Sequence, residues 1–209
     1  MTTAYSRSCL APLVLGAALA LLSGCATTSA PRSSVPVAPY RAALDLSGRI
    51  AINYSKDGKS ESLSGKFTWQ QSAARTEVGL ISPTGQTVAV ISLTPSSATL
   101  TQSGKAPRSA ADLDSLMHET LGWSLPVSGL REWLQGHAVT ADGKPFEASP
   151  AHDSVVTRDG WKLDYLSWQD PPGNGAAAVP QPKRIDVTRL ARGDVDEMAI
   201  RIVIDPIPE

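Results

Sequence analysis

Apolar and polar residues alternate along much of this sequence, and this period of two constrains the possible folds more than any other feature. It is clearest from Leu44 to Tyr54 and from Met198 to Asp205. Shorter runs with the same period occur at residues 63–69, 76–80, 87–93, 98–101, 155–157, 161–165 and 185–187. Because alternation puts all apolar side chains of a strand on one face, we expect antiparallel strands with one apolar and one polar face.

Turn residues separate these runs. Ser55-Lys56-Asp57-Gly58 predicts a hairpin, and Ser82-Pro83-Thr84-Gly85 has the residue preferences of a type I turn. The period changes to three and four between residues 109 and 136, where a capping box at Ser109–Asp112 precedes one helical pattern and Pro126 precedes another. The predicted fold is therefore mainly β, a meander of antiparallel strands with a small helical insertion whose apolar sides cover the sheet.

The N-terminal residues 1–24 are predicted to be a signal peptide. One arginine, Arg7, precedes an apolar run over residues 10–22, and the sequence Leu22-Ser23-Gly24-Cys25 follows as a lipobox. A transmembrane helix is the alternative, but the run is shorter than the roughly 20 residues that span a bilayer. We therefore expect Cys25 to become the first residue of a mature lipoprotein, with a diacylglycerol and an N-acyl chain, typically palmitate, as its covalent lipid.

The rest of the chain is predicted to form one domain on a tether. Residues 25–39 are mostly Ala, Thr, Ser, Pro and Val, a composition that predicts a flexible linker, and residues 40–209 contain all the periodic runs. Since Cys9 leaves with the signal peptide, no disulfide is expected in the mature protein. Ala26 follows the lipidated cysteine, and the absence of an inner-membrane retention signal (Asp) there favours the outer membrane.

Several function classes lack support in the sequence. The 19 Lys and Arg and 20 Asp and Glu residues nearly balance, so a nucleic-acid partner is not expected. His118, His137 and His152 have no metal-ligand spacing, and there is no nucleophile elbow or phosphate-binding glycine loop. We expect no catalysis, no metal and no cofactor; a hydrolase remains a third candidate, because a triad forms only in space.

The apolar residues of the strands and five tryptophans leave two interpretations open. In one, the sheet and the two short helices separate to admit a hydrophobic ligand. In the other, they pack fully on each other, and the protein is an accessory envelope lipoprotein that binds another protein. Periodicity alone does not choose between them.

Six local motifs, in this order, resemble the LolB family of outer-membrane lipoproteins. They are Leu46-Ser47-Gly48-Arg49-Ile50-Ala51, Gly65-x-Phe67-x-Trp69-Gln70, Ser82-Pro83-x-Gly85-Gln86-Thr87, Gly122-Trp123-x-Leu125-Pro126-Val127, Leu130-x-x-Trp133-Leu134-x-Gly136, and Trp161-x-Leu163-x-Tyr165 with Pro182-Lys183-x-Ile185. The resemblance runs from about Leu44 to Ile204.

The resemblance implies an unclosed antiparallel β-barrel, or half-barrel, with a helical lid over an apolar cavity. It also implies that the protein transfers lipoproteins and catalyses no chemical reaction. In this role the protein accepts acylated lipoproteins from the periplasmic carrier LolA and inserts them into the inner leaflet of the outer membrane. We expect a monomer that faces the periplasm of a Gram-negative bacterium.

Strand and helix periodicity then suggests which residues contact the cargo acyl chains. The expected cavity residues are Leu46, Ile50, Ile52, Phe67, Trp69, Val78, Leu80, Ile200 and Ile202 on the sheet, and Leu116, Met117, Leu130 and Trp133 on the lid. The alternative is that these residues pack only on each other.

The turn at Pro83, Thr84 and Gly85 departs from the family pattern. LolB-like proteins usually have an apolar residue, often Leu, at the position of Thr84, and that side chain is implicated in membrane insertion. Three interpretations remain open here: the turn works less by insertion, a neighbour such as Ile81 or Val88 contributes, or insertion differs in this protein.

Overall fold

The computed structural model describes residues 32–56, 59–121, 126–169, 179–189 and 197–206, and Arg32–Glu209 forms one compact unit. The strands are β1 (Leu44–Lys56), β2 (Lys59–Gln71), β3 (Thr76–Ile81), β4 (Thr87–Thr94), β5 (Ser97–Gln102), β6 (Arg108–Ala110), β7 (His137–Val139), β8 (Pro145–Glu147), β9 (Ser154–Val156), β10 (Trp161–Gln169), β11 (Gln181–Arg189) and β12 (Met198–Ile204). The helices of the described part are α2 (Leu113–Leu121) and α3 (Val127–Trp133).

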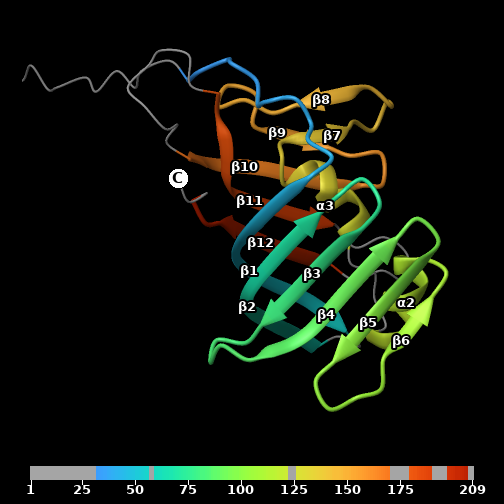
Figure 1. The fold of residues 1–209 in the computed structure, drawn as a ribbon. Coiled ribbons are helices and arrows are strands. Elements are labelled where there is room, and N and C mark those ends of the chain that lie inside the picture. The colour runs from blue at the N-terminus through green and yellow to red at the C-terminus, as the bar shows by residue number, and fades with distance from the viewer. Residues whose placement is uncertain (1–31, 57–58, 122–125, 170–178, 190–196, 207–209) are drawn as a thin grey trace, which may run out of the picture. The chain divides into compact units, whose positions relative to one another are not determined.

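Most strands belong to one antiparallel sheet of ten strands. Its order is β6-β5-β4-β3-β2-β1-β12-β11-β10-β9, so neighbours along the chain are neighbours in the sheet except where β1 pairs with β12 (Figure 1). The edge strands β6 and β9 do not pair with each other in the described residues, so the sheet is not closed into a barrel. The predicted fold class, a mainly β chain with an unclosed antiparallel sheet and a small helical insertion, is confirmed.

Strand β1 connects the two halves of the sheet. Ile50 lies opposite Gly65 of β2 and Ile202 of β12, so the first and last strands of the domain meet in one layer. Gly48 permits the close approach here: a Cβ at this residue would lie 2.2 Å from the Val203 carbonyl oxygen and 2.7 Å from the Phe67 ring. A side chain at residue 48 would therefore push β12 or Phe67 away.

The alternation of buried and exposed residues follows the predicted period. In β12 the buried residues are Met198, Ile200, Ile202 and Ile204, and in β10 they are Trp161, Leu163 and Tyr165. These side chains belong to one apolar core on a single face of the sheet. Helix α2 packs on β5 and β6, and α3 lies between β2–β3 and the strands β10 and β11 in Figure 1. The sheet and the helices thus enclose the core, as the patterning predicts.

The small sheet of β7 and β8 has no counterpart among the predicted strands. Each strand has three residues, too few to establish a period of two, yet Ala138 and Phe146 are paired and buried. Such short strands depend on tertiary packing, which the alternation of apolar and polar residues in the sequence does not reveal.

Residues 32–37, which precede β1, contact the folded domain. Val37 is 5% exposed, and its N–H donates to the Ala148 carbonyl over 3.0 Å. Ser33 accepts a hydrogen bond from the Ala151 N–H, and Arg32 pairs with Asp153 at 2.7 Å. Within the predicted linker of residues 25–39, Val37 is thus buried and the backbone of Ser33 and Val37 is hydrogen-bonded to the domain.

Candidate functional site

An apolar cavity lies between the sheet and helix α3. Its lining residues are Ile50, Ile52, Leu63, Phe67, Trp69, Val78, Leu80, Ile91, Val127, Leu130, Leu134 and Ile202. Every one of these side chains is apolar, and the cavity volume is about 40 Å³. Ligand pockets typically have about 300–1,000 Å³. In this conformation the interior is therefore nearly filled, and it must widen before it can hold a long apolar molecule.

Strand parity and helix periodicity position the lining residues. The pairs Phe67–Leu80 and Trp69–Val78 are direct cross-strand neighbours of β2 and β3, so their side chains lie side by side on the inner face. On the helix side, Val127, Leu130 and Leu134 are spaced by three and four residues, which places them on one helix face. The cavity is thus the junction of an inner sheet face with one side of α3.

The structure brings most, but not all, of the predicted cavity residues together. Those that line the cavity are Ile50, Ile52, Phe67, Trp69, Val78, Leu80, Leu130 and Ile202. Leu116, Met117, Trp133 and Ile200 do not line it and lie in the surrounding core, and Leu46 lines a second, separate pocket. Parity assigns a residue to a face, but position along the sheet decides what it contacts.

Four lining residues were not predicted: Leu63, Ile91, Val127 and Leu134. Each had a usable signal, because Leu63 and Ile91 belong to alternating runs and the other two flank Leu130 at helical spacing. Helix α2, in contrast, packs on β5 and β6 at the end of the sheet and not over the cavity. Only α3 therefore covers the cavity directly in the described residues.

Polar bonds attach α3 to both sides of the cavity. Arg131 donates through Nη1 to Thr76 Oγ1 at 2.6 Å and through Nη2 to the Ser72 carbonyl at 2.9 Å. At the other side, Tyr165 Oη donates to the Trp133 carbonyl at 3.1 Å. Burial raises the pKa of Tyr165 above its ordinary value, so this phenol stays protonated and remains a donor.

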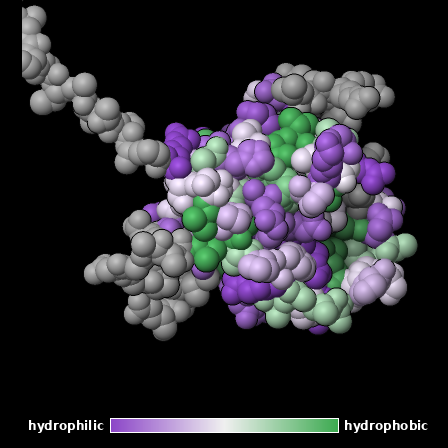
Figure 2. Space-filling model, turned by 90° about the horizontal axis from the view of Figure 1, so that it is seen from above, coloured by the Kyte–Doolittle hydropathy of each residue, from purple (hydrophilic) through white to green (hydrophobic). Residues whose placement is uncertain are grey.

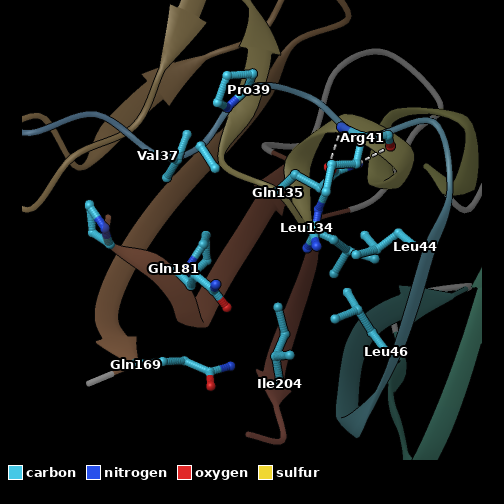
Figure 3. A pocket seen from close by; sticks show the side chains of 13 residues that line it. Val37, Pro39, Arg41, Leu44, Leu46, Leu134, Gln135, Gln169, Gln181 and Ile204 are labelled. Atoms are coloured by element: carbon cyan, nitrogen blue, oxygen red, sulfur yellow. Dashed lines mark hydrogen bonds between the residues drawn. The ribbon is translucent and has the colours of Figure 1, made fainter. Parts of the chain in front are cut away.

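The C-terminal end of α3 is also tied to the segment before β1. Gln135 Oε1 accepts from the Arg41 N–H at 2.9 Å, and Gln135 Nε2 donates to the Arg41 carbonyl at 3.1 Å (Figure 3). Gln71 Nε2 donates to the same carbonyl at 3.2 Å and to the Tyr40 hydroxyl at 2.9 Å. Because these bonds join parts of the chain far apart in sequence, they fix the position of α3 relative to the sheet.

A second pocket of about 130 Å³ lies beside this connection. Figure 3 shows Leu44, Leu46 and Ile204 on one side and Gln169 and Gln181 on another. Leu134 lines both this pocket and the apolar cavity. One leucine at the end of α3 is therefore part of the wall of each space.

The exposed side of the apolar cavity is at the β1–β2 hairpin. β3 ends at Ile81, opposite Lys66, so no strand of the described residues pairs with the earlier residues of β2 on that side. Leu63 lies in this part of β2 and is 49% exposed, although it also lines the cavity. The cavity is thus nearest to solvent at this end of the sheet.

The β3–β4 turn lies at the same end of the sheet. The Gly85 N–H donates to the Ser82 carbonyl at 2.9 Å, the hydrogen bond of a β-turn, and Gly85 has a φ of 89°. Pro83, Thr84 and Gly85 are all exposed, and Thr84 Oγ1 is 2.8 Å from Ser82 Oγ. The predicted turn is confirmed, with Thr84 on its exposed tip.

The described residues offer no other chemistry at the cavity. No group of three His, Cys, Asp or Glu residues lies close enough to hold a metal, and no buried side-chain polar atom in this part of the chain lacks a partner. No helix among the described residues is long and apolar enough to span a membrane. On the face seen from above in Figure 2, apolar residues form separate patches between polar ones. The cavity itself can act only through apolar contact.

Comparison with known proteins gives matches over nearly all of the chain. The sequence model of a family described as "Outer membrane lipoprotein LolB" matches residues 42–206. A protein from Cupriavidus taiwanensis named outer-membrane lipoprotein LolB is 40% identical over 200 residues, which cover 94% of this chain and 96% of that protein. Its namesake from Cupriavidus pinatubonensis is 39% identical and covers 94% of each chain.

Solved structures show a looser likeness. The crystal structure of a DUF1329 family protein from Desulfovibrio piger aligns with a TM-score of 0.42 and 11% identity, over 78% of this chain and 84% of that one.

Proposed function

This chain belongs to the LolB family of outer-membrane lipoproteins, and from this premise we propose that it accepts acylated lipoproteins from the periplasmic carrier LolA and inserts them into the outer membrane. The chain is an outer-membrane lipoprotein of the lipoprotein-localisation pathway. The observation that carries the finer proposal is the cavity under α3, because its lining is entirely apolar.

The proposal answers a physical need. A lipoprotein with three acyl chains exposes on the order of 45 methylenes, and at about 0.8 kcal/mol each their transfer from a bilayer to water costs roughly 36 kcal/mol. A cavity that replaces lipid with apolar side chains removes most of this cost. No nucleotide is required if each successive protein holds the cargo slightly better than the one before.

The small cavity volume means that cargo must open the site. The observation that supports α3 as the moving part is that the helix has only two turns and that few polar bonds hold it: those of Arg131 and the Trp133 carbonyl to the sheet, and those of Gln135 to the segment before β1. When α3 moves outward, the side chains that contact it on the sheet become an apolar groove for the acyl chains. The closed state keeps this surface from water when no cargo is bound.

We also propose that Cys25 carries the diacylglycerol and the N-acyl chain and that this anchor only places the domain at the membrane. Cys25 and the predicted signal peptide lie outside the described residues. The described core residues all lie between Val37 and Ile204, so a chain that begins at Ala26 keeps all of them. Such an unlipidated domain is expected to bind cargo.

A transfer assay tests the function. LolA loaded with a labelled lipoprotein is mixed with the domain of residues 26–209, without nucleotide or membranes, and each protein is then isolated through its own affinity tag. We expect the label to move to the domain. Label that stays on a carrier able to deliver to a known LolB would favour the alternative, an accessory lipoprotein with a packed core, which the small cavity volume also fits.

Replacement of Thr84 by Leu tests the proposed insertion turn of Pro83, Thr84 and Gly85. Thr84→Leu is expected to preserve insertion of cargo into liposomes or to raise its rate by about tenfold or more, because a buried leucine gains about 1.5–3 kcal/mol. The measurement is incorporation of labelled lipoprotein into liposomes over time.

Thr94→Leu is the matched control for this variant. Thr94 is also exposed, directly before a turn, with Oγ1 2.9 Å from Ser97 Oγ, but it is the last residue of β4 and lies at the opposite end of that strand. The control should insert cargo at the rate of the unmodified protein. Loss of insertion in Thr84→Leu alone would contradict the proposed role of the turn.

A further inference from the structure

The second pocket differs in chemistry from the apolar cavity beside it. Both spaces have leucine and isoleucine side chains in their walls, but the second pocket, of about 130 Å³, also has polar ones. Arg41 and Gln135 lie at one edge of it, and Gln169 and Gln181 lie at another (Figure 3). A space with apolar walls and polar groups at its edges suits an amphiphilic ligand.

Two of these polar side chains are free to donate hydrogen bonds. The hydrogen bonds of Arg41 use its backbone N–H and carbonyl, and its guanidinium forms no ion pair with another described residue. The Gln181 amide likewise has no hydrogen-bond partner in the part of the chain that the structure describes. Gln169, in contrast, donates to the Asp205 carbonyl at 3.3 Å, and Gln135 is bonded to the Arg41 backbone. Arg41 and Gln181 are therefore the donors available to a ligand.

Leu134 lies between the second pocket and the apolar cavity and lines both. On the sheet side, the inner face of β1 runs from Leu46 in the pocket to Ile50 in the cavity, with Gly48 between them. Gly48 has no side chain to fill this place, and the Phe67 ring lies over it, 2.7 Å from where a Cβ would be. Because Leu134 directly follows α3, the outward movement of the helix in the proposed function would join the two spaces.

The two spaces follow each other along β1. The second pocket contacts Leu44 and Leu46 near the start of the strand, and the cavity contacts Ile50 and Ile52 farther on. Leu63, which pairs with Ile52, is at the exposed end of the cavity. The joined space would thus have hydrogen-bond donors at one end and apolar walls along the rest of its length.

We propose that the second pocket binds the polar linkage of the cargo lipid, where the acyl chains are attached to the glycerol on the cargo cysteine. Ester carbonyls only accept hydrogen bonds, and a diacylglyceryl group carries two of them, which matches the two available donors, Arg41 and Gln181. The acyl chains would extend past Leu134 into the cavity, with their ends toward Leu63. Because Arg41 is exposed, the peptide part of the cargo would stay in solvent. The inference rests on the proposed function and deepens it.

Two synthetic lipopeptides test this proposal on the domain of residues 26–209. They share a fluorescent peptide with an acetylated N-terminal cysteine, and both carry two medium-length chains on the cysteine-bound glycerol. Ester bonds attach the chains in one lipopeptide, and ether bonds, which lack the carbonyl oxygen, attach them in the other. Fluorescence anisotropy below the critical micelle concentration measures the affinity. A net hydrogen bond contributes about fivefold, so we expect the ester form to bind roughly 25-fold more tightly.

The double variant Arg41→Met with Gln181→Leu removes both donors and keeps apolar side chains of similar length. It should lose roughly 25-fold in affinity for the ester lipopeptide and bind the ether lipopeptide as the unmodified domain does. Arg108→Met with Gln70→Leu is the matched control, because both residues are exposed and neither lines the pocket. This control should bind both lipopeptides normally. Urea unfolding of each variant shows whether its fold is intact.

Three results would overturn the proposal. One is a double variant at Arg41 and Gln181 that keeps its affinity for the ester lipopeptide, and another is a variant that loses both lipopeptides equally. The third is a variant that loses affinity for a free fatty acid but not for the ester lipopeptide, which would assign the pocket to a carboxylate. If the unmodified domain bound both lipopeptides equally, only this inference would fail. If it bound neither, the proposed function would fail as well.

Discussion

Replacement of Trp69 by alanine is expected to lower the free energy of unfolding by about 3–5 kcal/mol. Trp69 is only 1% exposed, lies opposite Val78 and Leu46, and lines the apolar cavity. Its Nε1 also donates to Gln71 Oε1 at 3.1 Å, and Gln71 in turn holds Tyr40 and the Arg41 carbonyl. The substitution therefore removes a large packed ring and loosens the connection to α3. Natural domains have a total stability of about 5–15 kcal/mol, so this loss is severe.

The same variant should bind apolar probes more strongly if it stays folded. Loss of the indole ring enlarges a cavity that has no polar lining, and such cavities stay dry and accept apolar ligands. Urea unfolding measures the stability, and the fluorescence of an apolar dye below the unfolding transition measures the cavity. Leu166→Ala is the control, because Leu166 is 54% exposed on β10 and should change stability by less than about 0.5 kcal/mol. A loss below 1 kcal/mol in Trp69→Ala would mean that the ring does not support the core as described.

Replacement of Arg131 by glutamine is expected to speed the uptake of cargo and to reduce stability. The guanidinium makes two charge-assisted hydrogen bonds, one to Thr76 Oγ1 and one to the Ser72 carbonyl, which join α3 to the β2–β3 connection. Thr76 is fully buried, whereas Arg131 itself is half-buried, so we expect a loss of about 2 kcal/mol. If these bonds must break before α3 moves outward, the same energy lowers the cost of opening. Uptake from LolA would then rise by up to about 30-fold.

Two control variants separate the role of Arg131 from a general effect of charge or helix stability. Glu132→Gln changes the next residue, which is exposed and forms no ion pair with the described residues, and should leave both stability and uptake unchanged. Arg131→Lys keeps the charge but not the two-pronged geometry, so it should give intermediate values. Stopped-flow fluorescence of labelled cargo measures uptake. If Arg131→Gln loses stability but takes up cargo no faster, α3 is not the part that opens.

The closed cavity and the proposed function are compatible because the protein must avoid exposing apolar surface between deliveries. An open groove of this kind would be an aggregation site in the periplasm. A short helix that covers the groove and is joined to the sheet by a few polar bonds keeps the surface dry at small cost. In the proposed function, acyl chains would then replace the helix on the sheet, because apolar contact with an acyl chain would substitute for apolar contact with Leu130 and its neighbours.

Local periodicity was enough to predict the sheet and the face of each long strand. Alternation at residues 198–204 placed Ile200 and Ile202 on the inner side of β12, and Ser82-Pro83-Thr84-Gly85 predicted a turn that the structure confirms. These features depend on side-chain direction and backbone preference within a few residues, so they can be inferred without the rest of the molecule. The family resemblance inferred from local motifs was confirmed by the match to the LolB family model over residues 42–206.

Only the tertiary structure decided which inner-face residues meet. Ile200 and Ile202 are both buried on the same face of β12, yet only Ile202 lines the cavity. The pairing of β1 with β12, the attachment of α3 through Arg131 and Gln135, and the burial of Val37 join residues far apart in the chain. A sequence sets the direction of each side chain through local geometry. Contacts between distant segments, and therefore the size of the cavity, follow from how all the segments pack together.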